Sequence, residues 1–354
     1  MTSSATFLAR LGIQYPVIQA PMTGTSTPRL AAAVSNSGGL GSLGIGANTV
    51  EQARQMIAET RALTAKPFNV NVFCHTPAQR DAAREAAWVQ HLAPLFAEVG
   101  AAPPDALNEI YRTFVNDEAA LQMLLELRPA VVSFHFGLPS PQALAVLREA
   151  GILTMASATS LQEARWIEQA GIDAIVAQGI EAGGHRGMFD PQAPDEGWST
   201  AVLVRMLVQQ TRLPIVAAGG IMDGAGIRAM LDLGAVAAQL GTAFVLCPES
   251  AANDAYRQNL KSERAAHTRL TEVISGRPAR GMVNRLITFG EAAGSPPTAG
   301  YPMTYDVAKQ LNAVASQQGN HEFAAQWAGQ GAPMVREMPA AELMQVLVRE
   351  WRGD

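Results

Sequence analysis

The sequence predicts an α/β protein built as one (β/α)8 barrel, also known as a TIM barrel. Short apolar runs alternate with amphipathic stretches, which is the pattern of parallel βα units. Eight such runs follow one another, and each is apolar nearly throughout, as expected for strands buried on both faces. An open doubly wound sheet has the same local pattern and is the structural alternative. Eight consecutive units favour closure into a barrel.

Each strand is expected at a run rich in Val, Ile, Leu and Ala. The eight runs are Pro16–Met22, Leu40–Gly46, Phe68–Phe73, Ala130–Phe136, Leu153–Ala158, Ala174–Gln178, Ile215–Gly219 and Ala235–Leu240. The amphipathic stretches predict helices at Arg29–Ser37, Val50–Leu63, Pro141–Ala150, Leu161–Ala170, Thr200–Thr211 and Gly224–Leu233. Several of these end at a glycine, which adopts the left-handed conformation of a helix C-cap at little cost.

Two regions interrupt the alternation. About fifty residues with two helical patterns separate strand three from strand four, more than one crossover needs. A long tail follows strand eight, with helical patterns at Asn253–Ser262, Val307–Gln317, Glu322–Ala328 and Ala340–Trp351. We therefore expect a barrel domain over 1–247, with a helical insertion at about 75–129, and a helical extension over 248–354. Both additions are expected to cover the barrel mouth, where the extension would contribute to the substrate pocket.

Composition limits the class of protein. The 354 residues are 48% hydrophobic and 16% charged, so a large core is available. The net charge is −5 and the basic residues are scattered, which argues against a nucleic-acid-binding face. No apolar run approaches the roughly 20 residues that span a bilayer, and the first residues lack the apolar segment of a secretory signal. Two cysteines give no disulfide framework or zinc spacing, so we expect a cytoplasmic protein without a metal site.

Glycines after strands seven and eight carry the strongest functional signal. Gly219 and Gly220 end one strand shortly before a helix, and Gly241 and Thr242 follow Gln239 and Leu240 at the end of the next. Such turns let backbone N–H groups approach a phosphate, beside a helix N-terminus with partial positive charge. Simple tight turns are the alternative for either motif alone. The pair on successive strands predicts a phosphate pocket.

The segment after strand six predicts a catalytic histidine. Gly183 and Gly184 precede His185 in a flexible loop, and the ends of barrel strands carry the reacting groups in this fold. A histidine there is suited to act as a base near neutral pH. Lone histidines are more often structural, but the loop and the neighbouring phosphate strands favour the functional interpretation. Arg186 either holds an anion or is a solvated loop charge.

Further candidates lie at other strand ends. His135 either lines the pocket or is a core histidine, because alternation turns only one of His135 and its phenylalanine neighbours inward. Asn71 is the better candidate than Asn69 to bond a cofactor ring, since it lies nearer the C-terminal end of its strand. Gln19-Ala20-Pro21-Met22 ends the first strand with backbone groups able to face a planar ligand, although Met22 could equally be core.

The tail contains Tyr301, Tyr305 and Lys309. If residue 304 begins a helix, Tyr305 and Lys309 are i,i+4 neighbours on one face. They would then present a hydroxyl and an ammonium to an anionic substrate. A surface helix would use the same residues.

At this point the chain resembles a known family, the class I nitronate monooxygenases, formerly 2-nitropropane dioxygenases. The segments that carry the resemblance are PVIQAPM, FNVNVFCH, VVSFHFG, VAQGIEAGGHRG, VAAGGIMDG, AAQLGTAFVLCPES and GNHEFAAQWAGQGA, from Pro16 to Ala332. AGGH and AAGG recur in other flavin barrels. FNVNVFCH, SFHFG and FAAQWAGQG are more specific to this class.

The resemblance implies a noncovalent FMN enzyme that oxidises propionate 3-nitronate and other alkyl nitronates with O2. The implied products are the oxo acid or aldehyde with nitrite and nitrate, formed via a flavin semiquinone in a detoxification reaction. His185 matches the family's base for neutral nitroalkanes. The implied FMN contacts are Asn71, Gln178, Gly183, Gly220 and Gln239–Thr242, and the implied pocket residues are Tyr111, His135, Tyr301, Tyr305 and Lys309.

Two other functions remain open from the sequence. A related flavin barrel that takes electrons from NADH or NADPH, such as an enoyl-carrier-protein reductase or a quinone reductase, shares the AGGH and AAGG elements. A noncatalytic sensor of a phosphate ligand could also keep the barrel, because function follows the site and not the fold. Neither the preferred nitronate chain length nor the oligomeric state can be read from the sequence.

Overall fold

Eight parallel strands form the barrel predicted from the sequence. The computed structural model describes residues 3–354, so the first two residues of the expected barrel domain lie outside it. The strands are β1 (Val17–Gln19), β2 (Gly41–Gly44), β3 (Phe68–Phe73), β4 (Val131–His135), β5 (Leu153–Ala158), β6 (Ala174–Gln178), β8 (Ile215–Ala218) and β9 (Ala237–Leu240), hydrogen-bonded in the order β1-β9-β8-β6-β5-β4-β3-β2. Leu40 joins the two ends, because its N–H donates to Val17 and its carbonyl accepts from Gln19.

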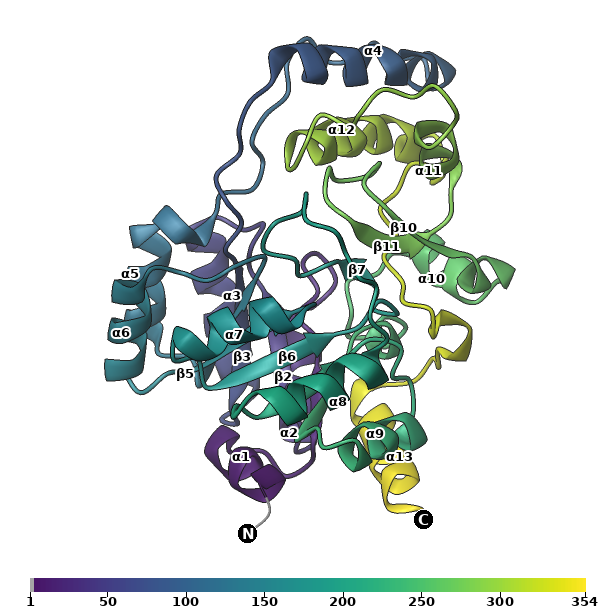
Figure 1. The fold of residues 1–354 in the computed structure, drawn as a ribbon. Helices are drawn as coiled ribbons and strands as arrows, with labels where there is room; N and C mark the ends of the chain where they lie inside the picture. Colours follow the sequence, from purple (N-terminus) through teal and green to yellow (C-terminus); the bar gives the residue numbers. More distant parts are fainter. Residues whose placement is uncertain (1–2) are drawn as a thin grey trace.

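The helices predicted between the strands are present and cover the outside of the barrel (Figure 1). They are α2 (Pro28–Asn36), α3 (Val50–Leu63), α5 (Glu118–Leu127), α6 (Pro141–Glu149), α7 (Leu161–Gln169), α8 (Thr200–Gln210) and α9 (Gly224–Asp232). Most begin at a Ser, Thr or Asp whose side chain accepts from the first turn, as Thr49 does for α3. The largest apolar cluster lies between these helices and the strands.

The barrel interior is closed at its N-terminal end by a helix that the sequence analysis did not identify, α1 (Ser3–Leu11). Phe7 and Leu11 belong to the same apolar cluster as Ile18, Val131 and Val216, whose side chains fill the barrel. In Figure 1, α1 lies at the end of the barrel away from the upper lobe. The opposite end, where the strands finish, is therefore the one left for a site.

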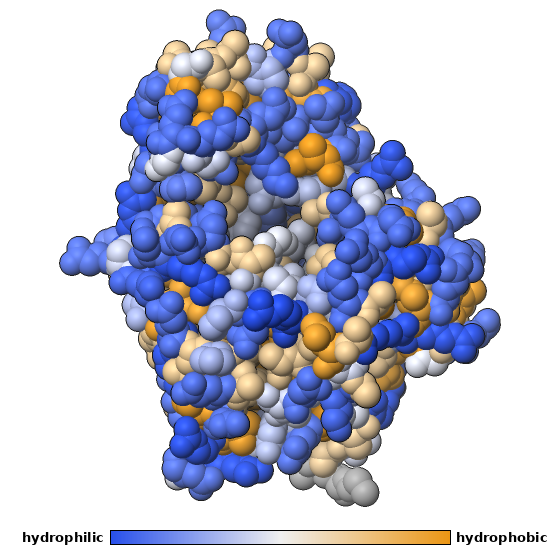
Figure 2. Space-filling view, turned by 180° about the vertical axis from the view of Figure 1, so that it is seen from behind, coloured by the Kyte–Doolittle hydropathy of each residue, from blue (hydrophilic) through white to orange (hydrophobic). Residues whose placement is uncertain are grey.

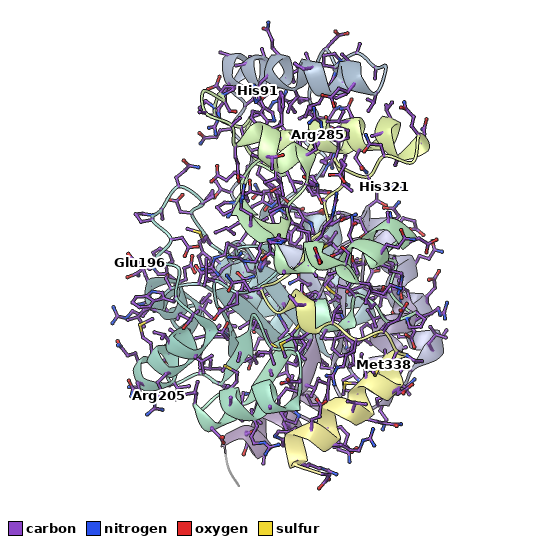
Figure 3. All side chains as sticks on the ribbon, turned by 90° about the vertical axis from the view of Figure 1, so that its right-hand side faces the viewer. His91, Glu196, Arg205, Arg285, His321 and Met338 are labelled. Carbon is purple, nitrogen blue, oxygen red and sulfur yellow. The ribbon has the colours of Figure 1, made fainter. Side chains whose placement is uncertain are left out.

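A second lobe covers that open end, as expected for the insertion and the tail. It is formed by α4 (Ala82–Glu98), α10 (Asp254–Leu260), α11 (Arg285–Gly290), α12 (Met303–Gln317) and the hairpin of β10 (Thr268–Thr271) and β11 (Ala279–Met282). Short 3-10 turns at Glu263–Ala266 and Ala332–Met334 contact each other, whereas those at Phe114–Asn116 and Thr242–Phe244 pack on the barrel core. Trp88, Leu92, Ile287 and Leu311 belong to a separate apolar core in this lobe. Figure 3 shows His91 and Arg285 in this upper lobe and Arg205 on the barrel.

Three details of the additions differ from the expectation. The two helices of the insertion belong to different parts of the molecule. Helix α4 packs on α12 of the second lobe, whereas α5 packs on α3 and α6 as an ordinary barrel helix. The last helix, α13 (Ala340–Arg352), does not cover the mouth; it packs against α9 and α2 and fills the eighth helix position of the outer ring. The hairpin β10–β11 was not predicted.

The prediction of a helix at Glu322–Ala328 is wrong. The segment begins with a turn, and residues 326–328 then run beside β11, where the Gln326 carbonyl accepts from Met282 and the Ala328 N–H donates to the Arg280 carbonyl. Backbone groups engaged in these pairings are not available for helical bonds. Within residues 3–354, no helix is both long enough and apolar enough to cross a membrane.

Candidate active site

A cavity of about 620 Å3 lies where the barrel strands end, beneath the upper lobe. Figure 2 shows the surface hollowed between the lobe and the barrel. This volume is within the range of small-molecule sites, roughly 300–1,000 Å3. The predicted site residues that line it are Ala20, Pro21, Met22, Asn71, Tyr111, His135, Gln178, Gly183, His185, Gly219, Gly220, Gln239, Gly241, Thr242, Tyr305 and Lys309.

Two predicted residues do not line the cavity. The Leu240 side chain is buried in the main core because strand alternation turns it outward, and its carbonyl accepts from the Ala20 N–H. The Tyr301 ring lies one layer behind the cavity wall, 5.9 Å from the His185 ring and 6.2 Å from the Tyr111 ring. Its hydroxyl is buried without a partner among the described residues.

The glycine turns after β8 and β9 form one end of the cavity. Gly219 and Gly220 have φ of 121° and 70°, which only glycine adopts at low cost. A Cβ on Gly219 would lie 2.7 Å from Thr200 Oγ1, so a side chain there would also clash. No hydrogen bond within the described residues uses the N–H of Gly220, Gly241 or Thr242. These N–H groups can bind an oxyanion.

The nearby helix N-terminus, in contrast, is already occupied by carboxylates. At the start of α9, the Gly224 N–H donates to Glu350 at 2.9 Å and the Gly226 N–H donates to Asp223 at 2.7 Å. Arg336 pairs with Glu350 at 2.6 Å. The partial positive charge expected from this helix is therefore neutralised by the protein itself.

Gln178 holds the loop that carries His185. Its Nε2 donates to the His185 carbonyl at 2.9 Å, and its Oε1 accepts from the Gly187 N–H at 2.7 Å. Gly183 packs so closely on the tail that a Cβ would lie 2.5 Å from the Gly329 nitrogen. The amide of Gln178 is thus engaged in positioning the loop while its side chain lines the cavity.

Arg186 serves neither of the two roles considered from the sequence. Its side chain is only 1% exposed and forms two hydrogen bonds to Asp195, at 2.7 and 2.9 Å. It also donates to the carbonyls of Gln178 and Gly179. A charge with this many partners is an internal anchor that fixes the loop to the end of β6.

His185 lies on β7 (Gly184–His185), which pairs with β11 of the tail. Rings surround its imidazole: Trp327 at 5.1 Å, Phe136 at 5.5 Å, Tyr301 at 5.9 Å and Tyr305 at 6.1 Å between centroids. Its Nε2 is buried and has no partner among the described residues. Burial lowers the pKa of His185 to about 3, helped by nearby His135, Arg277 and His75. The imidazole is neutral and able to accept a proton.

His135 lines the cavity and supports His185 directly. Its Nε2 lies 3.2 Å from the His185 carbonyl, which can only accept, so Nε2 carries the proton. Its Nδ1 then accepts from the Ser157 hydroxyl at 2.9 Å. Burial lowers the pKa of His135 to about 4, in keeping with this neutral tautomer.

Of the two asparagines of β3, Asn71 lines the cavity and Asn69 does not, as predicted. Asn69 is fully buried inside the barrel, where its Nδ2 donates to Ser42 and Ser133. Asn71 reaches the cavity, and its Nδ2 donates to Ser133. This leaves its Oδ1 as an acceptor at the cavity wall. Met22 satisfies both interpretations, because it lines the cavity and packs against the core.

Lys309 is the one formally charged side chain among the described cavity-lining residues. It lies on α12 one turn after Tyr305, as predicted, and its ammonium is 5.0 Å from the centre of the Tyr111 ring and 5.2 Å from that of Tyr305. It forms no ion pair with a described residue. An unpaired ammonium at the cavity is suited to an anionic ligand.

The sequence analysis did not assign roles to Trp327, Tyr256 or Arg277. The Tyr256 hydroxyl donates to the Trp327 carbonyl and so holds Trp327 against His185. Trp327 belongs to one of the family-specific segments quoted above, which was the available signal. Arg277 gave none, because its position depends on the unpredicted hairpin.

Comparison with known proteins agrees with this geometry. The family model described as nitronate monooxygenase matches residues 5–350. The chain is 58% identical to a nitronate monooxygenase of Pseudomonas aeruginosa, over 98% of this chain and 99% of that protein. It is 57% identical to a nitronate monooxygenase of Paraburkholderia phytofirmans, over 99% and 95%.

Solved structures show the same architecture. A nitroalkane oxidase from Streptomyces ansochromogenes has a TM-score of 0.89 and 39% identity, covering 99% of this chain and 98% of that one. FabK from Thermotoga maritima has a TM-score of 0.72 and 28% identity, covering 98% and 96%. With a family match along nearly its whole length and full-length relatives at 57% and 58% identity, the chain belongs to the nitronate monooxygenase family of enzymes.

Proposed function

We propose that this chain is a class I, FMN-dependent nitronate monooxygenase that acts in detoxification. It oxidises propionate 3-nitronate and other alkyl nitronates with O2 to the oxo acid or aldehyde plus nitrite and nitrate. One observation carries the proposal: a single cavity joins the free N–H groups of Gly220, Gly241 and Thr242 to the buried neutral His185. Cys74 and Cys247 are buried and unpaired, which supports a cytoplasmic location.

The cavity residues that come directly after the barrel strands fit FMN. The free N–H groups after β8 and β9 would hold the phosphate, in a turn where the positive φ of Gly219 and Gly220 keeps side chains away. The Asn71 Oδ1 offers an acceptor to the N–H edge of the flavin ring. No carboxylate lines the cavity among the described residues, so no side chain there repels a phosphate. When bound, the flavin supplies the electron chemistry toward O2.

His185 provides the proton chemistry. A neutral nitroalkane must lose a proton from carbon, and a neutral imidazole can take it. A preformed nitronate is already deprotonated and does not need this step. The aromatic wall of Phe136, Tyr305 and Trp327 excludes water from the ring and orients it.

Lys309 and the tyrosines around it would receive the anionic end of the substrate. The ammonium lies between the Tyr111 and Tyr305 rings, which limits its motion without neutralising it. The Tyr305 hydroxyl stays protonated because burial raises its pKa, so it can donate to an anion. The carboxylate of propionate 3-nitronate is the group that these donors would bind.

The test begins with the purified protein. We expect a flavin absorbance spectrum, FMN released on denaturation, and oxygen uptake with propionate 3-nitronate. NADH added anaerobically in parallel should leave the flavin oxidised. Rapid bleaching by NADH would instead support a nicotinamide-dependent reductase. FMN binding without turnover of any nitronate would support the noncatalytic sensor.

A further inference from the structure

Arg277 is a buried cation without a direct ion pair among the described residues. It precedes β11, and its side chain is 4% exposed. Its Nη2 donates to the Met188 carbonyl and its Nε has no partner among the described residues. The carboxylates of Glu163, Asp190 and Glu272 favour its charge, but none of them forms a direct ion pair with it. Burying an unpaired charge is unfavourable, so a chain that keeps one at this place calls for an explanation beyond packing.

Two aromatic rings separate Arg277 from His185. The guanidinium carbon lies 4.3 Å from the centre of the Phe136 ring and 5.8 Å from that of Tyr301. The same two rings contact His185 nearly edge-on, with interplanar angles of 90° and 77°. Phe136 has φ of 72°, in the left-handed region that non-glycine residues avoid. Backbone strain of this kind persists only where the surrounding packing enforces it.

The backbone around Arg277 also holds the loop of His185. Strand β11 pairs with β7 at His185 itself, and the Arg186 N–H donates to the Pro278 carbonyl at 2.8 Å. The bond from Arg277 to the Met188 carbonyl lies on the far side of the histidine. The loop is therefore attached to the tail both at His185 and three residues later.

We propose that Arg277 is a positioning residue that keeps the His185 imidazole in place and opposes its protonation, through Phe136 and Tyr301 and without contacting the substrate. This inference rests on the proposed function only in so far as it assigns proton acceptance to His185.

The charges around His185 support this role. The titratable groups that face it are His135 at the end of β4, His75 after β3, Tyr301 and Tyr305 near the start of α12, and Arg277. Burial lowers the pKa of His75 and of His135 to about 4 and that of Arg277 to about 10. Arg277 is thus the one group of this set that is charged at neutral pH. Its removal should raise the pKa of His185, because a positive neighbour opposes protonation.

The direct test is the titration of His185 in the FMN-bound enzyme, followed by NMR with labelled histidine. His185→Asn identifies the resonance by its loss. In Arg277→Met the pKa of His185 should rise by about one unit or more, a tenfold gain in proton occupancy. Arg277→Lys keeps the charge and should titrate as the wild type does. The proposal is overturned if the pKa of His185 is the same in Arg277→Met as in the wild type. It is also overturned if Arg277→Lys shifts this pKa by as much as Arg277→Met does. Should Arg277→Met fail to fold, Arg277→Gln replaces it.

A kinetic readout separates this role from a purely structural one. In Arg277→Met the acid limb of kcat/KM for nitroethane should move up by about one pH unit. The limb for ethyl nitronate should stay where it is, since that substrate needs no proton acceptor. Equal, pH-independent losses with both substrates would mean that Arg277 only holds the fold. If the wild type oxidises no nitronate, the proposed function fails, but the NMR titration still decides the role of Arg277.

Discussion

The two halves of the cavity are built in different ways. The half formed by the barrel binds with backbone N–H groups and neutral amides, and its residues come directly after strands. The other half is formed by the β7 loop and the tail, together with His135 from the end of β4. It contains buried aromatic rings, two neutral histidines and one ammonium. The barrel half is suited to bind a phosphate group that is the same whatever the substrate. The tail half is suited to proton transfer and to the choice of substrate.

This division shows where specificity resides in the molecule. Backbone groups cannot be altered by a side-chain substitution, so the barrel half changes little unless a glycine is lost. Tyr305, Lys309 and Trp327 come from segments that contact the cavity only through the folding of the tail. Each experiment below changes one half and asks whether the other half responds.

The largest effect is expected for His185→Asn. Turnover of nitroethane should fall by roughly 10²–10⁴-fold because the proton acceptor is lost. Much of the turnover of ethyl nitronate should remain, and FMN should stay bound. Steady-state oxygen uptake with both substrates measures this, with His267→Asn, an exposed histidine outside the cavity, as the control. Equal collapse with both substrates would refute the assignment of proton transfer to the tail half.

Gly220→Val alters the barrel half. A Cβ there adopts an unfavourable φ of 70° and meets the Glu181 side chain at 3.1 Å, which displaces a phosphate-binding N–H. We expect FMN to bind roughly 100-fold more weakly, from a loss of about 3 kcal/mol. Fluorescence titration of the apoprotein measures the Kd. Gly294→Val has a similar φ of 88° in open space and should leave the Kd unchanged. If Gly220→Val binds FMN as tightly as the wild type does, these turns do not bind the phosphate.

Lys309→Met alters the substrate end of the tail half. The KM for propionate 3-nitronate should rise about tenfold, the loss of one charge-assisted hydrogen bond. The KM for a nitronate without a carboxylate should change much less. Lys261→Met, which removes a surface lysine paired with Glu337, serves as the control. A uniform rise for all nitronates would place the nitronate group itself, and not the carboxylate, at Lys309.

The smallest effect is expected for Asp223→Ala. It removes the cap of α9 and should lower the free energy of unfolding by about 1 kcal/mol, measured by urea denaturation. Asp81→Ala removes the corresponding cap of α4 and should cost a similar amount. FMN affinity should be unchanged in both, because the Glu350 carboxylate still accepts from the Gly224 N–H at the N-terminus of α9. Weaker FMN binding in Asp223→Ala, but not in Asp81→Ala, would mean that the N-terminus of α9 contributes to phosphate binding.

The sequence predicted the barrel half well because its signals are local. Strand runs, glycine turns and a histidine in a glycine-rich loop each occur within a few residues, and the fold brings all strand ends together. Leu240 was the error there, since adjacent residues of a strand face opposite sides.

The tail half could be predicted only in part. The i,i+4 spacing of Tyr305 and Lys309 was sufficient to place them together, and the structure confirms that they share the cavity. The pairing of β11 with β7, and with it the position of Arg277, depends on contacts between residues almost a hundred positions apart. Short polar strands such as Thr268–Thr271 carry no apolar alternation that would identify them.

The position of α13 affects how the chain can assemble during synthesis. Because α13 is the eighth helix of the outer ring, the apolar faces of α9 and α2 stay uncovered until residues 340–352 have left the ribosome. Leu343, Met344 and Leu347 then close the outer layer. A chain that lacks these residues would leave the apolar faces of α9 and α2 exposed, and such surfaces promote aggregation.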